Sequence, residues 1–157
     1  MSAGTAGEAA VLAIDLGTTE VKVGLVGLDG RLLGLARAGY ATDADPATGR
    51  AEQDSDAWWG AIGLAAREVV RRAAGEVVAI GIDGHGPTLV AVDGAGRATH
   101  PAIIWQDTRS RAEQAELAAA TGIEGWGLAG LPAALWLERN APAAADATRW
   151  YLATWDF

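Results

Sequence analysis

The order of its predicted elements gives this sequence a mixed α/β fold. A short buried strand at residues 11–14 precedes two apolar runs, at 21–28 and 31–38, that the dipeptide Asp29-Gly30 joins as a tight hairpin. A helix follows over about residues 55–74, and a further apolar strand covers 77–82. The helix supplies a crossover and the Asp-Gly turn supplies an antiparallel pair, so we expect a mixed sheet with a hairpin on one edge.

Helical spacing of apolar residues predicts that one face of the 55–74 helix packs on the sheet. These residues are Trp58, Trp59, Ile62, Ala65, Ala66, Val69 and Val70. The polar segment before the helix, residues 41–53, contains Pro46 and Gly49 and reads as a loop that ends at a helix cap, Asp54 or Ser55. The helix should therefore begin next to the cap and end near Gly75.

The second half of the chain predicts a smaller hairpin and two helices. Residues 89–92 and 102–105 flank a glycine-containing turn at 93–96, and helices are expected at about 108–120 and 132–140. An alanine- and proline-rich patch covers residues 141–147, and no fixed-period repeat occurs. We expect a flexible N-terminus at residues 1–10 followed by one domain over 11–157.

Composition and charge favour small-molecule partners. Twelve basic and twenty acidic residues give a net charge of −8, the wrong sign for neutralising nucleic acid or anionic lipid. No stretch approaches the roughly 20 apolar residues that cross a bilayer, and the first ten residues lack the positive charge of a signal peptide. The sequence contains no cysteine, and its two histidines are far apart, so a zinc site is not supported. We expect a soluble, cytoplasmic protein that binds neither nucleic acid nor membrane.

The segment from Asp15 to Lys22, Asp-Leu-Gly-Thr-Thr-Glu-Val-Lys, is the strongest candidate for a chemical site. Gly17 lets the backbone approach a ligand, and Thr18 and Thr19 offer hydroxyl and N–H groups to phosphate oxygens. The Asp15 carboxylate at the strand end could hold a hydrated magnesium ion, and Lys22 could add a positive charge or point to solvent. The alternative is a plain tight turn that Asp15 caps through its side chain.

Taken together, the motifs resemble the FGGY carbohydrate kinases of the actin-like ATPase superfamily, and the resemblance covers nearly the whole chain. It rests on several segments that occur in the family's order: residues 15–19, 49–54 with Trp58-Trp59, 101–109, Thr121-Gly122 and 135–137. The resemblance implies a ribonuclease H-like mixed sheet with flanking helices, of which this chain is an incomplete N-terminal domain. It also implies ATP-dependent phosphorylation of a sugar or polyol hydroxyl with Mg²⁺.

For the nucleotide, the resemblance implies that Thr18, Thr19 and Glu20 lie around the ATP γ-phosphate, beside Gly17. Asp15 would serve the magnesium ion, and Lys22 stands where family members carry Arg or Lys.

For the acceptor, the resemblance implies contacts from the loop occupied by His85, Gly86 and Pro87, and from Trp105. Glycerol kinases carry Arg-Glu and xylulokinases Met-His where this chain has Gly86-Pro87, so neither substrate is matched. Two alternatives remain open: His85 as a loop histidine hydrogen-bonded to backbone or to Asp107, and Trp105 as a core residue. We interpret Asp107 and Arg109 as a structural ion pair at a helix start.

Part of the catalytic apparatus has no candidate in this sequence. In the family, the general base is an aspartate late in the first domain, and the second domain supplies the adenine site, so both are expected beyond residue 157. We therefore expect the 157-residue chain alone to be inactive. A free-standing sugar- or nucleotide-binding module without catalysis is the alternative function, and the full-length kinase could form homo-oligomers.

Overall fold

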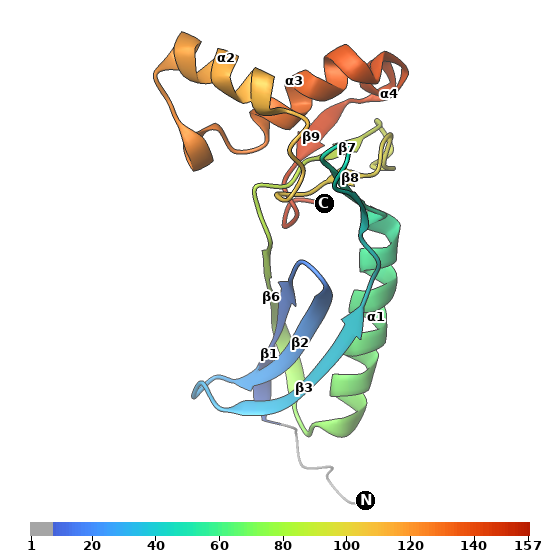
Figure 1. Ribbon diagram of the computed structural model, residues 1–157. Coiled ribbons are helices and arrows are strands. Elements are labelled where there is room, and N and C mark those ends of the chain that lie inside the picture. Colours follow the sequence, from blue (N-terminus) through green and yellow to red (C-terminus); the bar gives the residue numbers. More distant parts are fainter. Residues whose placement is uncertain (1–7) are drawn as a thin grey trace, which may run out of the picture. The chain divides into compact units, whose positions relative to one another are not determined.

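The computed structural model describes residues 8–157, which fall into two compact units. The first unit comprises the residues up to Tyr40 together with Ala57–Gly84, and the second comprises Ala41–Asp56 together with His85–Phe157. In Figure 1 the first unit contains the labels β1, β2, β3 and β6 and most of α1. The three later helices belong to the second unit.

A four-stranded mixed sheet forms the first unit. Its strands are β1 (Ala9–Leu16), β2 (Glu20–Gly27), β3 (Leu32–Gly39) and β6 (Glu76–Gly84), in the order β3-β2-β1-β6. β1 pairs antiparallel with β2 and parallel with β6, and β2 pairs antiparallel with β3. Gly30 has φ +83° in the β2–β3 turn, as the Asp-Gly dipeptide indicates. The predicted mixed sheet is confirmed.

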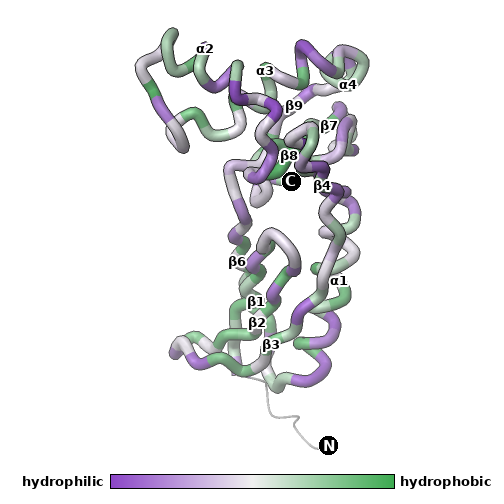
Figure 2. Tube along the Cα trace, viewed as in Figure 1, coloured by the Kyte–Doolittle hydropathy of each residue, from purple (hydrophilic) through white to green (hydrophobic). Residues whose placement is uncertain are grey.

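Burial alternates along the first two strands because successive side chains point to opposite faces of a sheet. Leu12, Ile14 and Leu16 of β1 are buried, and Figure 2 colours β1 and β2 largely as hydrophobic. β1 begins at Ala9, so it includes two residues of the segment expected to be flexible, and Ala10 is fully buried. Glu8 is also described, and its carbonyl accepts the Glu76 N–H at 2.8 Å. The expectation for residues 1–7 lies outside the described residues.

Helix α1 (Ser55–Arg72) begins at the predicted cap, where Asp54 Oδ1 accepts a hydrogen bond from the Asp56 N–H at 3.0 Å. Its buried apolar residues are Trp58, Ala61, Ala65 and Val69. A Cβ at Gly34 of β3 would lie 3.0 Å from side-chain atoms of Val69 and Ala73, so the helix packs closely over β3.

The prediction that Trp59 and Val70 also face the core is wrong. Both side chains are exposed, by 53% and 44%. Each follows a buried residue directly, and one step along a helix turns the side chain by about 100° away from the buried face. Adjacent apolar residues in a helix therefore do not share one packed surface.

Strand β6 is apolar but exposed. Val78, Ile80 and Ile82 are 55%, 62% and 53% exposed, and among residues 8–157 this strand pairs only with β1. An apolar run predicts a strand well, but burial depends on what else packs against that strand. The described part of the chain supplies no such cover.

The second unit contains two small antiparallel sheets. One holds β4 (Asp43–Asp45), β5 (Arg50–Gln53) and β8 (Ala102–Ile103), and the other pairs β7 (Val90–Val92) with β9 (Trp150–Leu152). The prediction of a plain loop at 41–53 is wrong, because the turn at residues 45–49 closes a short hairpin. In that turn Asp45 Oδ1 accepts the Ala47 N–H, and Gly49 has φ +80°.

The second predicted hairpin is present only as two bridges, Leu89 with Ile103 and Val92 with Ala98. β7 and β8 belong to different sheets, because β7 takes β9 as its partner and β8 takes β5. The turn between them is closed by the Asp93 N–H, which donates to the Arg97 carbonyl at 2.9 Å. The sequence therefore identified the turn but not the final strand partners.

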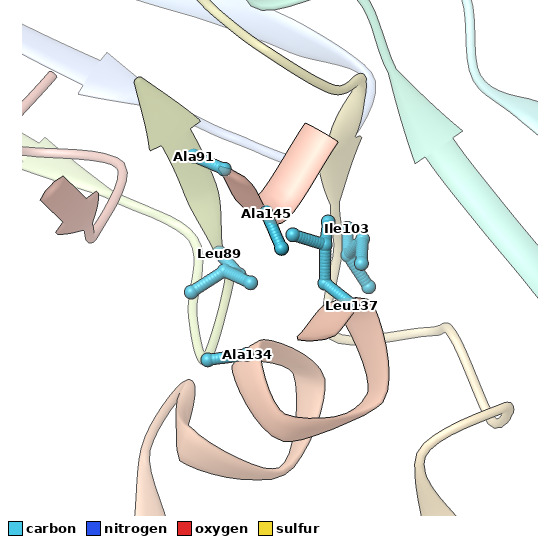
Figure 3. Packing of buried hydrophobic residues seen from close by; sticks show 6 residues of the cluster. All are labelled: Leu89, Ala91, Ile103, Ala134, Leu137 and Ala145. Carbon is cyan, nitrogen blue, oxygen red and sulfur yellow. The ribbon is translucent and has the colours of Figure 1, made fainter. Parts of the chain in front are cut away.

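Three α-helices and a 3₁₀ turn (Gly125–Leu128) complete the second unit: α2 (Arg111–Thr121), α3 (Leu131–Asn140) and α4 (Pro142–Ala147). Gly122, with φ +72°, ends α2 as predicted. The alanine- and proline-rich patch forms α4. A small core joins the strands to α3 and α4 (Figure 3) and comprises Leu89, Ala91, Ile103, Ala134, Leu137 and Ala145. No helix of the described residues is long and apolar enough to span a membrane.

Candidate functional site

The Asp-x-Gly-Thr-Thr segment forms the tip of the β1–β2 hairpin, called here the Thr-Thr hairpin (residues 17–20). The Gly17 N–H donates to the Glu20 carbonyl at 3.1 Å, which closes the tip. A Cβ at Gly17 would lie 3.0 Å from that same carbonyl oxygen, so the closed turn favours glycine. Thr18 is half-buried and Thr19 is exposed at the end of the sheet.

Charged residues surround the Thr-Thr hairpin in pairs. Asp15 lies opposite Lys22 in the β1–β2 register, and the Lys22 Nζ is 3.0 Å from Asp15 Oδ2. Glu20 pairs with Arg37 of β3 at 2.9 Å. The Lys22 ammonium is thus held beside the aspartate, with 40% of its side chain exposed. Both ion pairs are open to solvent, so they contribute little to stability and remain accessible to a ligand.

Sequence reasoning gave Asp83 no role, although the fold brings it next to Asp15. The parallel β1–β6 register places Asp15 directly beside Asp83, and neighbouring residues in a sheet project to the same face. Both aspartates lie near the end of an apolar strand, and this position was the signal in the sequence that could have identified Asp83 as a site residue. Residues 8–157 contain no group of three His, Cys, Asp or Glu side chains that could hold a metal ion. Mg²⁺ commonly uses one or two carboxylates and several waters, which this pair suits.

Tyr40, at the end of β3, also contacts the Thr-Thr hairpin and was missed by sequence reasoning. Its hydroxyl donates to the Gly17 carbonyl, and its backbone N–H donates to the Thr19 carbonyl at 3.3 Å. Burial and the nearby Asp15 and Glu20 carboxylates raise the pKa of Tyr40 to about 12. The hydroxyl is therefore a neutral donor at physiological pH.

A cavity of about 360 Å³ lies in the second unit, between the strands and helices α2 and α3. Two of the predicted acceptor residues, Pro87 and Trp105, line it, whereas His85 and Gly86 are not among its lining residues. Trp105 is 47% exposed, which disfavours the core alternative. Sequence reasoning did not assign a second tryptophan, Trp126, to this wall. The remaining lining residues are Leu89, Ile103, Ile104, Asp107, Ser110, Gln114, Gly125, Ala129, Gly130, Pro132 and Ala133.

His85 is held by its own loop and by the C-terminal segment. Its Nδ1 lies 3.0 Å from the Thr88 hydroxyl, and its backbone carbonyl accepts a hydrogen bond from the Thr154 hydroxyl. Burial lowers the pKa of His85 below its usual value, so the neutral imidazole is favoured. The Gly86-Pro87 peptide bond that follows is cis.

Replacing His85 with Gln should make the stability of the fold less dependent on pH below about pH 6.5. Because the folded-state pKa lies below the unfolded value of about 6.5, the unfolded chain takes up a proton first as the pH falls. The stabilising contribution is present above pH 6.5 and declines below it. Thermal unfolding between pH 7.5 and pH 5 should show a steeper loss for the wild type than for His85→Gln. Equal slopes would contradict this assignment.

A charged network fixes the wall of the cavity that carries Trp105. The Arg109 guanidinium pairs with Asp107 at 2.7 Å and with Glu52 of β5 at 2.6 Å, and it lies 4.1 Å from the ring centroid of Trp136. The Asp107 side chain is only 2% exposed and also accepts the Ala51 N–H. The predicted Asp107–Arg109 ion pair is confirmed, and its link to Glu52 was not foreseen.

The model of the FGGY family of carbohydrate kinases, N-terminal domain, matches residues 10–157. This match covers almost all of the chain, so the chain belongs to the FGGY family of carbohydrate kinases. The fold agrees with this membership, because similar solved structures include xylulose kinases.

Individual relatives are glycerol and xylulose kinases. The chain is 38% identical over 104 residues to a glycerol kinase of Xanthobacter autotrophicus, which covers 64% of this chain and 21% of that protein. It is 37% identical over 119 residues to a glycerol kinase of Thermus brockianus, covering 73% and 24%. The crystal structure of xylulose kinase from Rhodospirillum rubrum matches with a TM-score of 0.83 and 26% identity, over 94% of this chain and 32% of that one. The chain thus spans between a fifth and a third of the length of these relatives.

Proposed function

We propose that this chain is the N-terminal part of a cytoplasmic, ATP-dependent kinase that phosphorylates a hydroxyl of a sugar or polyol. The observation that carries the proposal is the Thr-Thr hairpin, which stands at the end of a buried strand with Asp15 beside it in a chain of the FGGY family. Phosphoryl transfer depends mainly on positioning and on electrostatic stabilisation, and a hairpin tip that offers N–H and hydroxyl groups suits both.

On the nucleotide side, the Thr18 and Thr19 hydroxyl and N–H groups would donate to phosphate oxygens. Asp15, with Asp83 on the neighbouring strand, would hold a hydrated Mg²⁺, which when bound neutralises charge on the transferring phosphate. The Lys22 ammonium, 3.0 Å from Asp15, would offset the negative charge of that carboxylate, which would otherwise repel the ATP phosphates.

On the acceptor side, the cavity of the second unit favours a neutral polyol. Among the described residues that line the cavity, Asp107 alone is charged, and its carboxylate already pairs with Arg109. Trp105 would cover the C–H surface of the acceptor, while Ser110 and Gln114 offer hydrogen bonds to its hydroxyls. Gly86 and Pro87 supply no side-chain hydrogen bond, so the acceptor contacts expected of glycerol and xylulose kinases at this loop are absent.

The best acceptor of the full-length protein should therefore be neither glycerol nor D-xylulose. A missing buried hydrogen-bond partner changes discrimination by about 1–3 kcal/mol, or roughly 5- to 150-fold in kcat/KM. ADP release coupled to NADH oxidation, measured across pentuloses, hexuloses, alditols and the corresponding aldonates, tests this expectation. Aldonates should be poor acceptors. A highest kcat/KM with glycerol or D-xylulose would show that the loop does not set specificity.

A further inference from the structure

We propose that Tyr40 is a positioning residue for phosphate binding, because it orients two peptide groups of the Thr-Thr hairpin toward the ligand. The inference rests on the proposed function of that hairpin. Tyr40 directly follows β3, lies 23 residues from the glycine whose carbonyl it binds, and is not part of the Asp-x-Gly-Thr-Thr motif.

The geometry of a trans peptide determines where the N–H groups next to the two bound carbonyls point. A peptide group is planar, and its C=O and N–H point to opposite sides. The Tyr40 hydroxyl binds the Gly17 carbonyl, so the N–H of the same peptide, which belongs to Thr18, points away from Tyr40. The Tyr40 N–H binds the Thr19 carbonyl at 3.3 Å, which directs the Glu20 N–H in the same sense. One residue thus fixes two peptides of the tip.

Tyr40 is itself fixed by the core of the first unit. Its ring centroid lies 6.4 Å from that of Trp58, at an interplanar angle of 57°, and Trp58 is only 1% exposed on α1. Such tilted aromatic contacts are favourable and limit ring movement. The hairpin tip is therefore connected through Tyr40 to the buried Trp58 side chain, and this connection would preorganise the backbone N–H groups before a ligand arrives.

The hydroxyl acts through the backbone and not as an anion. Because burial and two carboxylates hold its pKa near 12, Tyr40 remains a hydrogen-bond donor over the whole range of ordinary assays. Removing the oxygen alone should release the Gly17 peptide while leaving the ring contact in place. The substitution Tyr40→Phe makes this change.

The chain supplies a matched control, because its only other tyrosine is Tyr151. The Tyr151 hydroxyl also donates a hydrogen bond, to Glu138 at 2.7 Å, and its pKa is likewise raised to about 12 by burial and by Glu138. Tyr151 belongs to the second unit. Tyr40→Phe and Tyr151→Phe therefore remove the same chemical group from two different places.

Titration of the full-length protein by calorimetry tests the proposal, with the magnesium complex of the non-hydrolysable ATP analogue AMP-PNP (MgAMP-PNP) as the ligand because it carries a γ-phosphate. Tyr40→Phe should raise the Kd for MgAMP-PNP about tenfold with an unchanged binding stoichiometry, and Tyr151→Phe should stay within twofold of the wild type. A purely structural role would lower the stoichiometry or the melting temperature without changing Kd. That result, or an equal change in both variants, would overturn the proposal.

These measurements distinguish a failure of the positioning role from a failure of the proposed kinase function on which it rests. If the wild type binds MgAMP-PNP and Tyr40→Phe binds it equally well, the positioning role is wrong and the kinase assignment stands. If the wild type does not bind MgAMP-PNP, both are wrong. Should Tyr40→Phe fail to fold, amide hydrogen exchange of the wild type decides. MgAMP-PNP should slow exchange of the Thr18 N–H at least tenfold, and an unchanged rate would exclude the proposed orientation.

Discussion

Asp15→Ala in the full-length protein is expected to lower kcat for sugar phosphorylation about 100- to 1,000-fold, comparable to the loss of one preorganised electrostatic group from an active site. Folding should be almost unaffected. The Asp15 side chain is 53% exposed, and its ion pair with Lys22 is a surface pair of the kind worth about 0–1 kcal/mol. Steady-state kinetics and a urea unfolding curve of the same preparation separate the two effects.

Asp29→Ala provides the matched control for this prediction. Asp29 lies in the β2–β3 turn of the same unit, and its side chain is 60% exposed beside Arg31, at 3.7 Å. Removing it deletes a carboxylate of similar exposure and pairing at the far end of strand β2. Asp29→Ala should keep kcat within twofold of the wild type. If Asp15→Ala retained full turnover, Asp15 would have no catalytic role and the tip would be an ordinary turn.

Arg109→Met should destabilise the protein by about 3–5 kcal/mol, because it leaves two buried carboxylates without their counter-charge. Asp107 and Glu52 have side chains that are 2% and 10% exposed, and both pair with this guanidinium. Met retains much of the side-chain volume next to Trp136 but cannot pair with either acid. The free energy of unfolding from urea titration at pH 7.5 measures the effect.

Arg97→Met is the comparison for Arg109→Met. Arg97 also pairs with an aspartate, Asp93, at 3.0 Å, but its own side chain is 79% exposed. Losing that pair should cost less than about 1 kcal/mol. A cost for Arg109→Met no larger than for Arg97→Met would mean that water reaches Asp107 and Glu52 and that the network does not hold the cavity wall.

Local signals predicted those parts of the fold that depend on neighbouring residues. The Asp29-Gly30 turn identified the β2–β3 hairpin, and Gly122 identified the end of α2. Partners remote in sequence were not predictable in this way. β7 pairs with β9 across about sixty residues, and nothing in the sequence of either strand indicates its partner. Burial was overestimated for Trp59 because apolar character was taken as a sign of packing.

The candidate site likewise contains parts that the sequence predicted and parts that it did not. The Thr-Thr hairpin is continuous in sequence, so a motif could locate it. Tyr40 contacts the hairpin from just beyond the end of β3, and no periodicity or spacing in the sequence connects the two. The cavity draws its lining from Pro87 through Ala133, so sequence reasoning found Pro87 and Trp105 but not Trp126. The assignments of His85 and Gly86 to acceptor binding remain predictions.

We predict that the full-length protein transfers the γ-phosphoryl group of ATP, bound at the Thr-Thr hairpin, to a neutral sugar or polyol. Mass spectrometry of the reaction products tests it most directly. The best acceptor from the screen should gain the mass of one phosphoryl group in a 1:1 ratio with ADP formed. Asp15→Ala should reduce the yield at least 100-fold, and the 157-residue chain alone should form no product. ADP formation without a phosphorylated acceptor, or full yield with Asp15→Ala, would contradict it.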